Sequence, residues 1–216
     1  WALLMGRGIV HPCAAVGSTH DPSHPSLLDW LADDFRRSGH DIRRLVRAIA
    51  LSKPYRLDSR RPDGVDDPAL FAWSLEKPLT AEQLTRSVAT ALRGRTTLSD
   101  ETASLHRPMR AQLPDVLPAD SVATVKTALF LSNHPALNQF IEHSNQPEHL
   151  IPRLMELPSS ADRVAMLFQT LYGRPAAPDE QQAIHDYLES SPSRLNDRLT
   201  QVTWSMLTSA EFQFNH

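Results

Sequence analysis

Residues 80–94 have the sequence TAEQLTRSVATALRG, and this stretch predicts an α-helix with both ends marked. Thr80 and Gln83 have the spacing of a capping box, in which the two side chains bond backbone N–H groups of the first turn. Gly94 suits the left-handed residue that commonly ends a helix. The apolar positions lie three and four residues apart, as in a helix with one buried side: Leu84, Val88, Ala91 and Leu92.

The same spacing recurs on both sides of this helix. Between Ser23 and Pro54 we expect a helical hairpin, in which Ser23 caps the first helix, Ser38-Gly39 ends it and Asp41 begins the second. Beyond it, residues 57–68 are polar and predict a surface loop. Further apolar runs follow over residues 122–130, 137–141, 150–157, 159–173, 178–188 and 191–207. The sequence therefore predicts an all-α fold, an orthogonal bundle of several helices with little or no sheet.

Residues 95–119 interrupt this pattern. They contain Pro108, Pro114 and Pro118 and show no sustained helical period, so we expect an extended connection or a boundary there. We place the division near Ser121. It would separate an N-terminal helical subdomain with long loops, residues 1–120, from a C-terminal helical bundle, residues 121–216.

The composition limits the kinds of partner. The chain has 216 residues, of which 41% are apolar, and a formal net charge of −3, so it can form cores but has no excess of cations for nucleic acid. Arginines do gather between residues 36 and 47, but aspartates lie among them, which predicts a salt-bridged surface. No apolar run approaches the roughly 20 residues that span a bilayer, so we expect no membrane insertion by this segment. The apolar run Trp1–Met5 resembles the last turn of a helix, which predicts a longer parent chain.

Two groups of residues are candidates for a site. Imidazole and thiolate groups bind zinc, and His11, Cys13, His20 and His24 lie close together in the sequence, so they are a candidate metal centre. In the alternative interpretation, His24 lies in the first turn of its helix and bonds the backbone or a neighbouring loop. Phe71 and Trp73 lie in a loop-rich region and, if exposed, would contact a partner protein or a glycan. No GxSxG nucleophile motif is present.

Several blocks of the sequence, in order, resemble one family. They are residues 1–10, 22–32, 38–43, 49–55, 78–84, 128–133, 171–175 and 207–212. Together they are similar to a domain of unknown function at the C-terminal end of large planctomycete-type proteins. Such proteins often carry a cytochrome-c-like domain and a cytochrome-associated domain upstream. The sequence departs from the pattern after Pro12, where relatives tend to have acidic residues and this chain has Cys13-Ala14-Ala15.

The resemblance implies an exported or cell-envelope parent protein. It assigns no catalytic residue, because the family has no established activity. We expect no cofactor in this segment, although an upstream domain of the parent would hold a haem. The partners that it implies are sister domains of the same parent chain, with another protein or a glycan as alternatives.

Two functions follow as hypotheses. The first is a structural or interaction role for a helical module of a larger exported protein. The alternative is a metal-dependent or hydrolase-like domain that acts on extracellular polymers through the His-rich loop of residues 11–24. Whether the chain is an enzyme is left open by the sequence.

Overall fold

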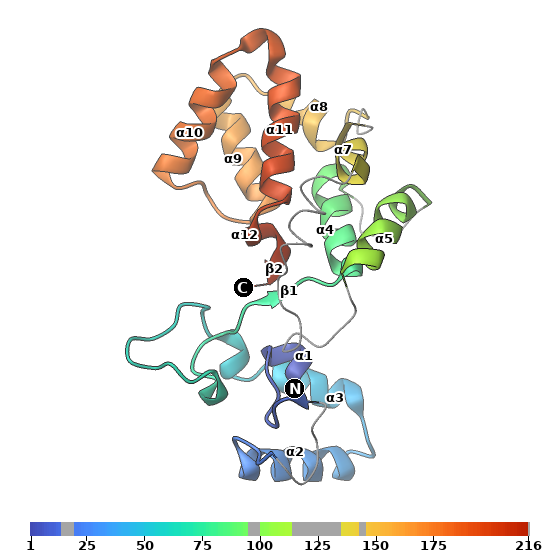
Figure 1. The fold of residues 1–216 in the computed structure, drawn as a ribbon, viewed down its shortest axis with the longest axis vertical. Helices are drawn as coiled ribbons and strands as arrows, with labels where there is room; N and C mark the ends of the chain where they lie inside the picture. The colour runs from blue at the N-terminus through green and yellow to red at the C-terminus, as the bar shows by residue number, and fades with distance from the viewer. Residues whose placement is uncertain (14–19, 95–99, 114–134, 143–145, 216) are drawn as a thin grey trace. The chain divides into compact units, whose positions relative to one another are not determined.

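The computed structural model describes residues 1–13, 20–94, 100–113, 135–142 and 146–215, and these residues are mainly helical (Figure 1). The chain divides into two compact units. Unit 1 is formed mainly by Trp1–Pro78, and unit 2 by Leu79–Asp115 with Ala123–Phe214. The predicted all-α helical bundle is confirmed. Among the described helices, none is both long and apolar enough to cross a bilayer.

Unit 1 contains the predicted helical hairpin. Its elements are α1 (Ala2–Met5), α2 (Pro25–Arg37), α3 (Ile42–Ala50), η2 (Pro54–Arg56), η3 (Pro68–Leu70) and the strand β1 (Lys77–Pro78). Asp41 caps α3 as predicted, because its carboxylate accepts a 3.0 Å hydrogen bond from the backbone N–H of Arg44. The cap of α2 is His24 instead of Ser23. Ser23 is engaged elsewhere, since its N–H and its hydroxyl both donate to the carbonyl of Ile9.

The core of unit 1 is small. Met5, Ile49 and Phe71 form a cluster of buried apolar side chains, with four partly buried side chains packed around them: Trp1, Leu4, Leu45 and Tyr55. Gly6 ends α1 with a φ of 80°, a conformation that glycine adopts without strain. A Cβ atom at this position would lie 2.9 Å from the Cβ of Leu75. The end of α1 therefore depends on the absence of a side chain at Gly6.

Unit 2 is a larger bundle arranged around α11 (Leu195–Leu207), which contacts α7 (Pro135–Glu142), α8 (Leu150–Glu156), α9 (Ser160–Leu171) and α10 (Pro178–Glu189). The remaining elements are α4 (Ala81–Arg93), α5 (Asp100–Gln112), η5 (Pro192–Arg194), α12 (Ala210–Gln213) and the first residue of the strand β2 (Phe214–Asn215). The core of unit 2 is formed by leucine, valine, isoleucine, methionine and phenylalanine side chains from these helices, and four of them are completely buried: Leu154, Val164, Leu167 and Leu199.

Helix α4 has the predicted ends. The N–H of Gln83 donates to the Thr80 hydroxyl at 3.2 Å, and the N–H of Thr80 donates to the Gln83 side chain at 2.9 Å, which completes the capping box. Gly94 ends the helix in the left-handed conformation, with a φ of 63°. The capping and termination signals in the sequence were therefore sufficient to define this helix.

The prediction for residues 95–119 was wrong where the structure describes them. Residues 100–112 form the helix α5, with Pro108 inside it. Leu105 and Met109 lie one turn apart on its buried side, and the Thr85 hydroxyl of α4 donates to the Met109 sulfur at 3.4 Å. Burial of this side against α4 offsets the hydrogen bond that a proline removes from a helix.

The predicted boundary near Ser121 and the apolar run of residues 122–130 lie outside the described residues. Helices α4 and α5 pack against α8 and α7, respectively, and so belong to the same unit as the C-terminal helices.

Arg174 connects two distant parts of unit 2. It follows α9 and forms hydrogen-bonded ion pairs with Glu180 in the first turn of α10 and with Glu211 in α12. The Glu180 carboxylate also accepts the backbone N–H of Ala177 at 2.7 Å. These hydrogen bonds, led by those from Arg174, hold the pKa of Glu180 at about 2. Both carboxylates raise the pKa of Arg174, chiefly through the same hydrogen bonds.

Candidate functional site

The candidate metal ligands of the His-rich loop lie in unit 1. His11 and Cys13 are half-buried, His20 is exposed, and His24 caps α2. The His24 ring lies 3.1 Å from the Ser23 hydroxyl, so it bonds within its own turn. Within residues 1–13 and 20–94, as in the rest of the described chain, no three His, Cys, Asp or Glu side chains gather as a metal would require. The metal centre stays a prediction.

The structure instead brings His24 together with aromatic residues. Its ring centroid lies 5.7 Å from that of Phe71, and the Phe71 ring meets Trp1 edge-on at 5.4 Å. Phe71 is only 6% exposed and packs with Met5 and Ile49, so its side chain belongs to the core of unit 1. A partner contact by Phe71 required an exposed ring, and the structure does not provide one. Trp73 is half-buried, and its proposed contact stays a prediction.

The helical hairpin, in contrast, leaves apolar side chains in solvent. No residue of α2 is buried, although the helix is amphipathic over 13 residues, and Trp30 is 59% exposed. In α3, Ile49 is the one buried residue, while Ile42 is 66% and Val46 43% exposed. Ile42 and Val46 are four residues apart and therefore lie on one side of the helix, one turn from each other. Exposed apolar side chains that cluster in this way are typical of contact surfaces.

Cations lie next to these two side chains. Arg43 and Arg47 are exposed, also one turn apart, and each directly follows one of the two apolar residues in the sequence. Arg44 pairs with Asp34 at 2.9 Å, whereas Arg43 and Arg47 form no ion pair with an acid in the described parts of the chain. We call Ile42, Arg43, Val46 and Arg47 the α3 surface. It is an apolar stripe beside a basic stripe.

The sequence interpretation found these residues but not their arrangement. It predicted that the arginines and aspartates of the hairpin neutralise one another, and three pairs do form: Arg36 and Arg37 with Asp33, and Arg44 with Asp34. The composition of α3 already indicated that some of its arginines would have no acidic partner. Asp41 is the only acid near its start and serves as the cap, so three arginines within six residues exceed the acids available on that helix.

The comparisons with known proteins give a family but no function. The sequence model of one protein family matches residues 1–115, and the family is described as PSD1, protein of unknown function (DUF1553). This match covers more than half of the 216 residues and includes the whole helical hairpin. No curated protein and no solved structure matches the chain. The chain therefore belongs to the PSD1 family of proteins of unknown function (DUF1553).

Proposed function

We propose that the chain is a helical interaction module of a larger exported multidomain protein, and that its α2–α3 hairpin docks on a sister domain of that protein. The observation that supports this proposal is the α3 surface, with Ile42 and Val46 in solvent beside Arg43 and Arg47. By the family resemblance, the parent is exported or associated with the cell envelope, and its upstream part carries the cytochrome-c-like domain with its haem.

The surface defines the chemistry of its partner. Complete burial of an isoleucine or valine side chain contributes about 1.5–3 kcal/mol, so covering Ile42 and Val46 favours association. The partner surface would therefore present apolar side chains opposite them. Arg43 and Arg47 would then be desolvated at the edge of the contact and would require carboxylates, because an unpaired charge at an interface is costly. We propose an acidic and apolar surface on the sister domain.

The local fold is suited to this role. Leu45 and Ile49 anchor α3 to the core of unit 1, because Ile49 is buried with Met5 and Phe71 and Leu45 packs against them. Ile49 is seven residues from Ile42 and so lies on the same side of the helix, and its burial fixes the orientation of Ile42 and Val46 before binding. A surface that is already ordered loses little conformational entropy when a partner binds.

Hydrogen–deuterium exchange tests the proposal. The parent protein and the isolated chain would be compared by mass spectrometry, and we expect peptides covering residues 42–51 to exchange more slowly in the parent. The double variant Arg43→Glu with Arg47→Glu should remove this protection. A matched charge reversal on α5, Arg107→Glu with Arg110→Glu, should leave it intact, because both arginines lie exposed in unit 2. Equal exchange of residues 42–51 in the parent and in the isolated chain would rule out the docking.

A further inference from the structure

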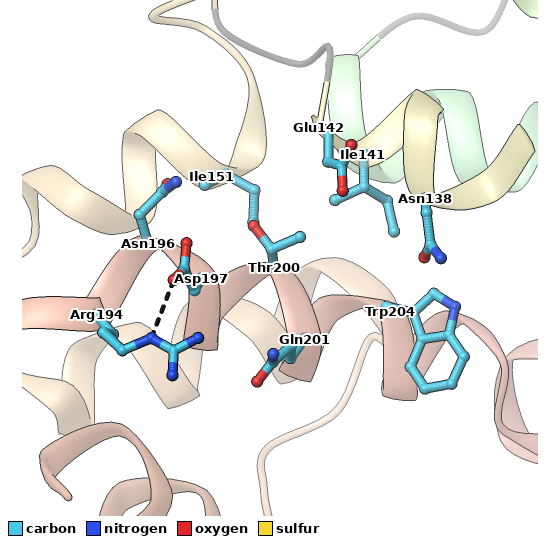
Figure 2. A pocket seen from close by; sticks show the side chains of 10 residues that line it. All are labelled: Asn138, Ile141, Glu142, Ile151, Arg194, Asn196, Asp197, Thr200, Gln201 and Trp204. Atoms are coloured by element: carbon cyan, nitrogen blue, oxygen red, sulfur yellow. Dashed lines mark hydrogen bonds and ion pairs between the residues drawn. The ribbon is translucent and has the colours of Figure 1, made fainter. Parts of the chain in front are cut away.

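A cleft of about 690 Å³ lies in unit 2, bordered by α7, α8 and α11 (Figure 2). This volume is in the range of small-molecule binding sites. The described residues that line the cleft belong to unit 2, whereas the α2–α3 hairpin belongs to unit 1.

The pattern of α11 explains why the cleft is polar. Leu199, Val202 and Met206 are buried in the core of unit 2 on one side of the helix. On another side, Asp197, Thr200, Gln201 and Trp204 follow one another at spacings of three, one and three residues, which places them along a single stripe that lines the cleft. Helix α11 therefore has two functional sides, one for packing and one that presents hydrogen-bonding groups.

The opposite wall comes from α7. Asn138 and Glu142 are four residues apart and share one side of that helix. Figure 2 shows the Asn138 side chain pointing from α7 toward Trp204 on α11. An amide, a carboxylate and an indole thus border the same space.

The polar groups have unequal hydrogen bonding. Arg194 pairs with Asp197 at 3.2 Å, so these two opposite charges largely compensate each other. The Gln201 carbonyl oxygen accepts from the Tyr187 hydroxyl, which directs the amide N–H groups of Gln201 toward other acceptors. The Trp204 indole N–H is buried and has no partner in the described residues. Because this nitrogen is out of reach of solvent, a ligand in the cleft would contact the partly exposed ring of Trp204 and take its hydrogen bonds from the amides of Asn138 and Gln201.

We propose that this cleft binds a neutral saccharide. Each sugar hydroxyl both donates and accepts, and the amides of Asn138 and Gln201 and the Thr200 hydroxyl offer both functions. The partly exposed indole of Trp204 offers an apolar ring, against which the C–H groups of a sugar ring can pack. An anion would meet the carboxylate of Glu142, and Arg194 of the described lining is already paired with Asp197. An apolar ligand would leave most of the polar lining without partners.

Isothermal titration calorimetry of the full chain with four neutral hexasaccharides tests this assignment: cellohexaose, xylohexaose, mannohexaose and maltohexaose. We expect at least one of them to bind, and Trp204→Phe to weaken that binding at least about tenfold. Trp30→Phe is the matched control, since Trp30 lies exposed on α2 in unit 1. Its affinity should equal that of the unmodified chain.

Gln201→Leu provides a second variant, because Gln201 is exposed and its replacement does not disturb the core. It should also weaken binding about tenfold, and circular dichroism of each variant would verify the fold. The assignment is overturned if none of the four sugars binds at about 10 mM, or if both cleft variants bind as well as the unmodified chain. Tighter binding of hexagalacturonate, which carries a carboxylate on each ring, would overturn the neutral class of ligand.

Discussion

Arg174 and Glu211 are 37 residues apart in the sequence, and the arginine holds the carboxylate by two hydrogen bonds, Nε to Oε1 at 2.6 Å and Nη2 to Oε2 at 2.8 Å. The same guanidinium bonds both oxygens of Glu180 at 2.8 Å. Glu180 lies in the first turn of α10 and Glu211 lies in α12, so the Arg174 side chain connects the start of α10 to α12.

Removal of the charge of Glu211 should destabilise unit 2. Glu211→Gln keeps the shape of the side chain but weakens two charge-assisted hydrogen bonds, and we expect a loss of about 1–2 kcal/mol because the pair is partly exposed. The control is Glu82→Gln on α4, whose pairing with Arg86 at 2.8 Å is more exposed. That change should cost less than about 0.5 kcal/mol. Urea unfolding followed by circular dichroism measures both, and equal losses would contradict a special role for Arg174.

The same ion pair predicts how stability depends on pH. The pKa of Glu180 is about 2 in the folded chain, against 4.5 as its ordinary value. Since the folded state binds the proton less tightly, this carboxylate stabilises the fold above the unfolded pKa, and the contribution is lost as the pH falls from about 4.5 toward 2. The stability difference between the unmodified chain and Glu180→Gln should therefore shrink over this interval. A difference that is constant between pH 5 and pH 2.5 would exclude the mechanism.

Two isoleucines on α3 form a matched pair for the hairpin. Ile49 is 4% exposed and Ile42 is 66% exposed, although the helix and the residue type are the same. Ile49→Ala should destabilise unit 1 by about 2–4 kcal/mol, because it leaves a cavity beside Met5 and Phe71. Ile42→Ala should change the stability by less than about 0.5 kcal/mol. Thermal unfolding of both variants measures the contrast, and a large loss for Ile42→Ala would show that its side chain is packed in the isolated chain.

The two interpretations of the His-rich loop predict different zinc contents for the chain. A site formed by His11, Cys13, His20 and His24 would hold about one zinc per chain, and His24→Ala would lower that content. The contact of the His24 ring with Phe71 supports the other outcome, in which His24→Ala lowers the stability of unit 1 and leaves the zinc content unchanged. Elemental analysis together with thermal unfolding separates the two, and a stoichiometric metal that depends on His24 would revive the metal-dependent alternative.

Three of the correctly predicted helices have ends that are marked by local chemistry, whereas α8 and α11 were predicted from apolar spacing and have no side-chain cap. Thr80 with Gln83, Asp41, and Ser159 with Asp162 cap α4, α3 and α9, respectively, through contacts within three residues. Helix α5 was missed because its evidence is not local. Pro108 argues against a helix, and what stabilises α5 is the burial of Leu105 and Met109 against another helix.

The same distinction applies to the candidate sites. The α3 spacing of apolar residues predicts a helix with an apolar side, but it does not reveal whether that side is covered. Exposure of Ile42 and burial of Phe71 depend on which distant segments form the small core of unit 1. The polar stripe of α11 was visible in the sequence as residues 197–204. That this stripe faces Asn138 and Glu142 could not be predicted, because it depends on the packing of α7 against α11.

Gly6 also limits how this chain can change during evolution. A side chain at this position would meet the Cβ of Leu75 at 2.9 Å while the backbone has a φ of 80°. At Gly39 the φ is 71°, but a Cβ atom would find nothing within 4 Å, so asparagine is tolerable there. Related sequences should thus keep glycine at the first position and have glycine or asparagine at the second. The pair offers a simple signature for recognising genes that encode the same unit.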